Sequence, residues 1–313
     1  KQSPSSSLVV RCILGLNALD GERRTLIIRI GGTVMQRAVT HRVTFRQYAL
    51  ASACALLLGA TTTIHAQKLT WIENPYSNPS QLLPVGVDDK GTVFIRYRSS
   101  SGFDAYRWQN GELLKLTPST NDELTCTPTE DGRIPLQAFG NVYFWQPLGL
   151  ANIASQSTIR YAKGVTADGS SIVGFNASSS RAIVWQGGSI TTLPIPSGAT
   201  RSDAVQISDN GLYVAGSVQY PALRACRWAF TNDGWQYLEL GTLGGNFSRA
   251  GSISNDGTII ALTSTDAAGY VKACVWQATS GLTALPNLGG TQSFLTNHEG
   301  LGRAMSVDGA FIV

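Results

Sequence analysis

Short apolar runs separated by glycine-containing turns fill most of the chain, and similar stretches recur along it. Residues 252–262 read SISNDGTIIAL, and related stretches begin at Val165, Gln206 and Ser306. An Asn-Gly or Asp-Gly pair between short apolar runs is the sequence signal of a β-hairpin. The recurrence of one hairpin at similar intervals indicates a repeat architecture rather than an isolated turn.

Two independent landmarks give the period of this repeat. Successive turn glycines lie 41, 37, 42, 46 and 52 residues apart; they are Gly91, Gly132, Gly169, Gly211, Gly257 and Gly309. Five tryptophans lie 37, 40, 43 and 48 residues apart; they are Trp108, Trp145, Trp185, Trp228 and Trp276. Each tryptophan follows its glycine by 13 to 19 residues. The two landmarks therefore keep one phase over five units and define the repeat.

Each unit contains four predicted strands. One precedes the Asp-Gly turn, one follows it, one ends at the tryptophan, and one follows a second turn, as in QNGELLKL and QGGSITTL. The residue three positions before each tryptophan is Ala or Val, which predicts that another element packs closely there.

Units of about 40 residues with four antiparallel strands are the plan of a β-propeller blade. We therefore predict an all-β, β-propeller-like repeat domain over residues 67–313. It would hold five four-stranded blades plus a partial one, truncated at its C-terminal end in SVDGAFIV. The alternative is a β-solenoid, whose coils are usually shorter, about 20 to 30 residues.

The region before this domain has the pattern of an export signal. Arg37, Arg42 and Arg46 precede an apolar run over residues 48–60, and small and polar residues follow. This order is typical of a secretory signal peptide, and the run is shorter than the roughly 20 residues of a membrane span. We predict an upstream segment without a fold of its own (1–34), a signal peptide (35–66) and cleavage between Ala66 and Gln67. A buried Ala/Leu helix is the alternative.

Removal of residues 1–66 changes the charge of the chain. The full sequence has 24 basic and 20 acidic residues, and residues 67–313 have 16 and 18. No basic stripe remains, so we do not expect the domain to bind nucleic acid. Three cysteines remain, Cys126, Cys226 and Cys274, without a C-x-x-C pair, so we expect buried free thiols rather than a zinc site.

The residues that carry most enzyme chemistry are sparse in residues 67–313. The only histidine is His298, which lies in a polar loop segment, and the acidic side chains at 122, 123, 130, 239 and 299 form no pair by spacing. Asp168, Asp209, Asp256 and Asp308 recur once per unit, so they would lie around a ring and shape turns rather than converge on calcium. We predict no catalytic residue, no metal and no cofactor.

Two aromatic residues stand outside the repeat pattern. Trp235 and Tyr237 follow an Asn-Asp-Gly turn in NDGWQYLEL and fall on one face of a strand. They are suited either to stacking on a sugar ring or to packing against the next blade. The sequence leaves both readings open.

The later units resemble the HAF-repeat extracellular proteins of bacteria. The matching features are LGTLGG at residues 240–245, Ser248-x-Ala250, Asp256-Gly257, and the Ala-x-x-Trp strands at Ala225 and Ala273. The family's strand reads His-Ala-Phe-x-Trp, and Arg or Lys stands here in place of the His, so no role of that His is carried over. The resemblance is strongest from about residue 160. It implies export and a propeller-like fold, and some members look like autotransporter passengers; the family has no well-established activity.

Together these patterns predict an exported binding or scaffolding module that is extracellular, on the cell surface or periplasmic. Its ligand is unknown, either carbohydrate or protein, and the mature chain has no predicted membrane span. The alternative is a carbohydrate- or peptide-active enzyme with its site in the propeller funnel. A structural spacer is a third possibility. Converging acidic groups at the funnel mouth would favour the enzyme, and aromatic or small polar residues would favour a binding module.

Overall fold

A computed structural model gives the fold, and within the residues it describes every regular element is a strand. The described residues are 11–16, 24–30, 33–39, 70–73, 82–88, 90–99, 102–117, 123–124, 126–138, 141–146, 149–152, 159–176, 178–286, 290–293, 295, 305–306, 308–310 and 312. The chain divides into two compact units, residues 1–80 and residues 81–313.

The first unit contains one four-stranded sheet in the order β3-β2-β1-β4. Its strands are β1 (Arg11–Leu16), β2 (Arg24–Ile30), β3 (Thr33–Val39) and β4 (Thr70–Glu73). Strands β1 and β2 lie within residues 1–34, and the predicted division into an upstream segment, a signal peptide and a repeat domain stays a prediction. Both β2 and β3 are rich in apolar and β-branched residues, and Gly31-Gly32 separates them in the sequence, which is a hairpin pattern. The predicted cleavage site between Ala66 and Gln67 lies outside the described residues and stays a prediction.

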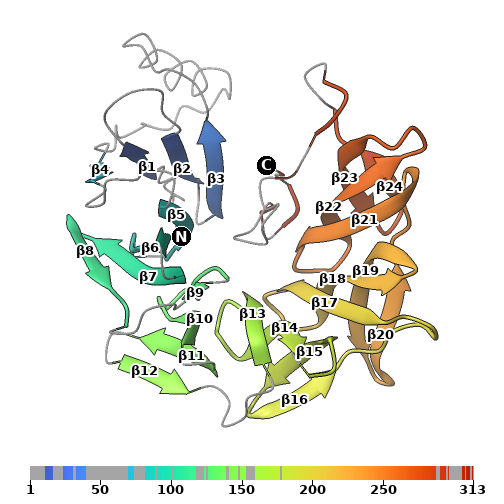
Figure 1. The fold of residues 1–313 in the computed structure, drawn as a ribbon, viewed down its shortest axis with the longest axis horizontal. Coiled ribbons are helices and arrows are strands. Elements are labelled where there is room, and N and C mark those ends of the chain that lie inside the picture. Colours follow the sequence, from blue (N-terminus) through green and yellow to red (C-terminus); the bar gives the residue numbers. More distant parts are fainter. Residues whose placement is uncertain are drawn as a thin grey trace, which may run out of the picture. The chain divides into compact units, whose positions relative to one another are not determined.

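The second unit contains five four-stranded antiparallel sheets, which we name blades I to V (Figure 1). Blade I is β5 (Leu82–Val87), β6 (Val93–Ser99), β7 (Gly102–Gln109) and β8 (Glu112–Lys115); blade II is β9 (Glu123–Leu124), β10 (Ile134–Ala138), β11 (Asn141–Gln146) and β12 (Gly149–Asn152); blade III is β13 (Ile159–Val165), β14 (Ser171–Asn176), β15 (Arg181–Gln186) and β16 (Ser189–Thr192); blade IV is β17 (Arg201–Ile207), β18 (Tyr213–Tyr220), β19 (Ala222–Thr231) and β20 (Gly234–Glu239); blade V is β21 (Gly244–Ile253), β22 (Ile259–Asp266), β23 (Val271–Gln277) and β24 (Gly281–Ala284). The prediction of a β-propeller-like domain with four-stranded blades is confirmed.

The first strand of each later blade packs on the middle strands of the blade before it. In this way β13 contacts β10 and β11, β17 contacts β14 and β15, and β21 contacts β18 and β19. The hydrophobic core accordingly consists of clusters between neighbouring blades. A further cluster joins blade V to Leu295 and Met305, so the start of a sixth unit packs on blade V as each blade packs on its predecessor.

The repeat tryptophans occupy one register position in all five blades. Their cross-strand partners are Val93, Ile134, Ile172, Val214 and Ile260, each near the start of its blade's second strand. Trp228 is fully buried, and Trp108, Trp145 and Trp276 are 8 or 9% exposed, whereas Trp185 is half-buried. The large ring at this position fills the gap between adjacent sheets.

In blades III, IV and V the alanine three positions before the tryptophan donates a backbone hydrogen bond across the seam to the next unit. The backbone N–H of Ala225 donates to Ser248 Oγ (2.9 Å), that of Ala182 to Ser202 Oγ (2.8 Å), and that of Ala273 to Ser293 Oγ (2.9 Å). Each serine belongs to the first segment of the next unit. This seam is the close packing that Ala or Val predicted at this position.

The recurring turns also share one geometry. All six turn glycines have φ between 68° and 86°, and each donates its N–H to the carbonyl three residues earlier. A Cβ on Gly257 would lie 2.3 Å from the ring of Tyr213, so this glycine also permits close packing between blades IV and V. In the turn of blade IV the residue equivalent to Asp168 is Asn210, and not Asp209: Asn210 accepts from Ser208 Oγ (2.7 Å) as Asp168 accepts from Thr166 Oγ1 (2.7 Å).

Candidate binding surface

The hairpin between β19 and β20 makes blade IV unlike the other blades. Its outer strand β20 has six residues, whereas β8, β12, β16 and β24 have four each. The strands turn through Asn232 and Asp233, and Gly234 closes the loop with a φ of 85°. Thr231 Oγ1 accepts from the N–H of Asp233 (3.2 Å) and donates to the carbonyl of Gly234 (3.1 Å). The turn is therefore held by its own hydrogen bonds and extends the outer edge of the blade.

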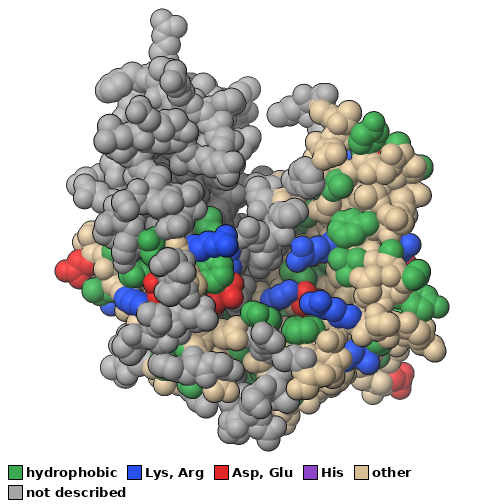
Figure 2. Space-filling model, viewed as in Figure 1, with side chains coloured by type: hydrophobic (Ala, Val, Ile, Leu, Met, Phe, Trp, Pro, Cys, Tyr) green, Lys and Arg blue, Asp and Glu red, His purple; other side chains and the backbone are tan. Residues whose placement is uncertain are grey.

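An aromatic pair lies near the end of this hairpin. Phe230 and Trp235 face each other across β19 and β20 with ring centroids 5.3 Å apart, and Phe230 is 50% exposed. Leu212 is 42% exposed and lies beside them, because the N–H of Phe230 donates to its carbonyl (2.8 Å). Figure 2 shows hydrophobic side chains reaching the surface on the side where Figure 1 draws blades IV and V. We call Leu212, Phe230 and Trp235 the aromatic patch.

Polar groups surround the aromatic patch. Asn232, Asp233 and Gln236 are exposed, and Gln236 Nε2 donates to the carbonyl of Asp233 (3.4 Å). Apolar rings edged by amides and a carboxylate are the usual composition of a surface that binds a ligand by contact area and orients it by hydrogen bonds.

Trp235 and Tyr237 pack within the protein, but against the preceding seam rather than against the next blade; stacking on a sugar ring stays a prediction. Tyr237 packs edge-on against Trp228 (ring centroids 6.2 Å apart), and both Trp235 and Tyr237 pack against the cluster between blades III and IV. Burial raises the pKa of the Tyr237 hydroxyl. The exposed ring is Phe230, which the sequence analysis did not single out. The sequence feature that indicates Phe230 is the spacing between Trp228 and Gly234, which is longer than the spacing between the tryptophan and the following glycine in the other blades. The extra residues place Phe230 beyond the packed part of the blade.

The acidic residues considered as enzyme candidates are dispersed or neutralised. Glu123 pairs with Arg96 (2.7 Å), and Glu239 pairs with Arg224 (3.5 Å). Asp122, His298 and Glu299 lie outside the described residues. Within the part of the chain that the structure describes, no three His, Cys, Asp or Glu side chains gather in a way that would hold a metal ion.

The first strands carry a charged pair between blades III and IV. In four blades the first strand has a β-bulge, at Val85, Lys163, Val205 and Gly251. The bulged Lys163 pairs with Asp203 of the next blade, and both side chains are about one-fifth exposed, at 21% and 17%. Because the two charges neutralise each other across the seam, this pair serves blade packing.

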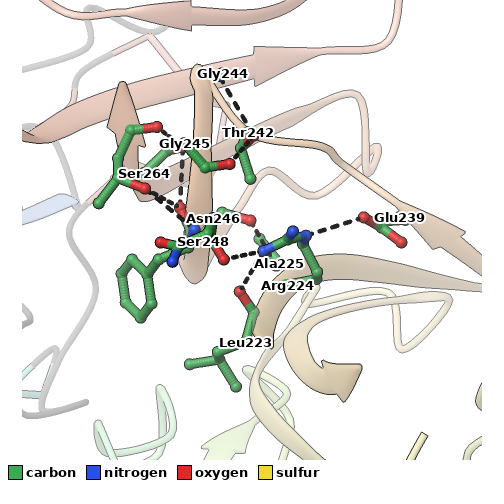
Figure 3. Close-up of polar contacts among 12 residues, drawn as sticks. Leu223, Arg224, Ala225, Glu239, Thr242, Gly244, Gly245, Asn246, Ser248 and Ser264 are labelled. Atoms are coloured by element: carbon green, nitrogen blue, oxygen red, sulfur yellow. Dashed lines mark hydrogen bonds and ion pairs between the residues drawn. The ribbon is translucent and has the colours of Figure 1, made fainter. Parts of the chain in front are cut away.

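The LGTLGG segment forms the crossing from blade IV to blade V (Figure 3). Thr242 Oγ1 donates to the carbonyl of Gly245 (2.8 Å), and Arg224 binds the carbonyl of Asn246. Lys272 binds the carbonyl of Thr291 (2.6 Å) at the equivalent crossing after blade V. Arg224 and Lys272 therefore each hold the crossing to the next unit against the blade that precedes it.

The three described cysteines are free and buried, as predicted. Burial raises the pKa of Cys126 and Cys226, and it raises the pKa of Cys274 to about 11. These thiols stay protonated at neutral pH and are poor nucleophiles and metal ligands. Of the residues that the structure describes, none belongs to a helix long and apolar enough to cross a membrane.

Comparison with known proteins identifies the fold of the chain but no family. No protein-family model matches the chain, and no curated protein matches it. Among solved structures, TolB from Acinetobacter baumannii is similar with a TM-score of 0.50 and 15% identity, covering 91% of this chain and 70% of that TolB. A putative TolB from Agrobacterium tumefaciens is similar with a TM-score of 0.51 and 18% identity, covering 75% of this chain and 89% of that protein. At this identity the likeness shows a shared β-propeller fold.

Proposed function

We propose that the domain is an exported binding module and that the aromatic patch of blade IV contacts its ligand. The observation that carries the proposal is Phe230, a half-exposed ring packed against Trp235 in a hairpin whose outer strand is longer than the outer strands described for the other four blades. An exposed aromatic ring loses little conformational entropy on binding and offers a large contact area. The ligand class is carbohydrate or protein, because both use aromatic platforms.

The architecture supports this role. Hydrogen bonds to Ser202 and Ser248 and hydrophobic clusters join the inner strands of blades III, IV and V. The outer hairpin of blade IV therefore extends from a rigidly packed part of the domain. A rigid scaffold that presents a variable hairpin is suited to recognition. Export is supported by the basic residues, short apolar run and small residues of the predicted signal peptide.

An enzyme in the funnel receives less support. That alternative required converging acidic groups, and the described candidates Glu123 and Glu239 pair with arginines in different blades. No specific observation favours a second function, so we propose binding alone.

Site-directed photo-crosslinking tests the proposal. The photoreactive amino acid p-benzoylphenylalanine would replace Phe230 in the full chain, which cells would express and export. The matched control carries the same amino acid at Thr191, an exposed position of blade III. We expect an adduct from position 230 and none from position 191. Digestion with a protease or with glycosidases would identify the adduct as protein or carbohydrate. No adduct at 230, or equal adducts at both positions, would contradict the proposal.

A further inference from the structure

The outer strand of blade IV, β20, has an open edge. The hydrogen bonds around β19 and β20 show which backbone N–H and C=O groups of β20 point to that edge. The N–H of Phe230 donates to Leu212, on the side away from β20, and the N–H of Leu240 donates to Ala225 (3.0 Å). In an antiparallel pair, hydrogen-bonded and non-hydrogen-bonded residue pairs alternate. The pair Phe230–Trp235 is therefore non-hydrogen-bonded, and so are the pairs of Tyr237 and Glu239 with their β19 partners.

Three residues of β20 consequently direct their backbone groups away from the blade. The N–H and C=O groups of Trp235, Tyr237 and Glu239 point to the open edge, and among the described residues none of these backbone groups has a hydrogen-bond partner. Alternating donors and acceptors at this spacing fit the backbone of one more extended strand.

This edge also lacks the features that usually block strand addition. It carries no proline and no lysine, and its side chains include Trp235 on one face and Leu238, 40% exposed, on the other. By contrast β8 ends in Lys115, and β12, β16 and β24, which also lack proline and lysine, are only four residues long. Natural edge strands are protected by short length, lysine or proline. Strand β20 is the longest of the five outer strands and is the least protected.

The charge at the two ends of the edge restricts the partner. Asp233 is exposed at the hairpin tip, and at the other end the Glu239 side chain remains 43% exposed although it pairs with Arg224 (3.5 Å). Together with the free backbone groups, the Asp233 carboxylate and, more weakly, the exposed Glu239 pair favour an extended peptide with β-branched residues in its centre and basic residues at its ends.

We propose that blade IV binds an extended, basic-ended peptide segment of a partner protein, which adds to β20 as a fifth strand. The inference rests on the proposed function and names the class and the binding mode of the partner. The main-chain hydrogen bonds of Trp235, Tyr237 and Glu239 supply the binding geometry, and the aromatic patch and Leu238 contact the peptide's side chains.

The probe is the heptapeptide acetyl-Lys-Thr-Val-Thr-Val-Thr-Lys-amide, used with the full chain. Its control carries N-methyl groups on the alternate residues that face the protein, which removes backbone donors and keeps every side chain. We expect amide hydrogen exchange, resolved by NMR, to slow at least about tenfold at Trp235, Tyr237 and Glu239 with the probe and not with the control. The amides of Gln236 and Leu238, already bonded to β19, should not change. A side-chain contact without strand addition would leave all five amides unchanged and would overturn the inference.

Two substitutions at equivalent register positions sharpen the test. Leu238→Lys places a like charge beside the basic probe and should weaken its binding about tenfold. The matched control is Leu114→Lys on β8, because Leu114 pairs with Arg107 as Leu238 pairs with Arg227 and is 43% exposed. Equal weakening in both variants would contradict the preference for β20.

Two other outcomes overturn the inference in distinguishable ways. Protection of the three amides that rises with protein concentration, without the probe, would assign the edge to a second copy of the chain. A crosslink at position 230 with no amide protection by the probe would leave the binding module standing and reject strand addition.

Discussion

Blades III and IV share their inner strands and differ in their outer hairpins. Trp185 and Trp228 occupy the same register position, and Ser202 and Ser248 accept the same hydrogen bond at the following seam. Beyond these positions blade III turns through Gly187-Gly188 into a short polar strand, whereas blade IV adds the aromatic patch and a six-residue edge. The comparison indicates that blade packing constrains the inner strands and leaves the outer hairpin free to acquire a binding role.

The largest expected difference between the two blades concerns their tryptophans. Trp228→Ala should lower the free energy of unfolding by about 3–5 kcal/mol, because it removes a fully buried ring. Trp185→Ala should cost less, about 1–2 kcal/mol, because Trp185 is half-buried in the same position. Urea denaturation of both variants measures the difference. Equal losses would show that burial does not distinguish the two sites.

The hydrogen bonds that Ser202 and Ser248 accept across the seams between blades should stabilise the two seams equally. Ser202→Ala and Ser248→Ala each leave the N–H of a buried alanine without its acceptor, which should cost about 1–3 kcal/mol. Ser280→Ala, at an exposed position, is the control and should change stability by less than about 0.5 kcal/mol. Denaturant titration checks all three. A loss in only one seam variant would mean that the seams are not equivalent.

The turns should differ in their response to acid. A backbone hydrogen bond from Ser170 lowers the pKa of Asp168, and a hydrogen bond from Ser254 lowers that of Asp256; Asn210 takes the same place in blade IV without a titratable group. A lowered folded pKa adds stability above the unfolded carboxyl pKa of about 4, and this stability is lost as the pH falls through the folded value.

The variant Asp256→Asn copies the natural turn of blade IV and tests this difference. It should keep the turn at neutral pH and make the unfolding free energy less steep between about pH 5 and pH 2. The reverse substitution, Asn210→Asp, should make that dependence steeper. Melts across this pH range measure both slopes. Unchanged slopes would show that the turn carboxylates do not contribute to acid stability.

The smallest stability effect is expected where the binding effect is largest. Phe230→Ser should lower the unfolding free energy by only about 1 kcal/mol, because half of the ring is already in solvent. The same substitution should abolish the adduct formed from a photoreactive residue at Leu212. A strong loss of stability would instead identify Phe230 as a packing residue.

Much of the inner fold was predictable, and the outer surface was not. Two landmarks, the turn glycine and the tryptophan, carry the repeat, because positive φ and a buried ring each restrict the residue type. The sequence pattern did not predict Phe230 as an exposed ring, because no packing rule demands an aromatic residue on an exposed extension. Asp209 was mistaken for the turn residue because Asp and Asn accept the same hydrogen bond, and only the register places Asn210 there.

Exchange of the outer hairpin tests most directly whether the inner strands carry the fold and the hairpin of blade IV carries the binding. Residues 229–236 would be replaced by the four residues 186–189 of blade III, with Trp228 and Tyr237 kept and the photoreactive residue at Leu212. We predict one cooperative melting transition within about 3 °C of the parent and loss of the adduct. An adduct that persists, or a chain that no longer folds, would contradict the account.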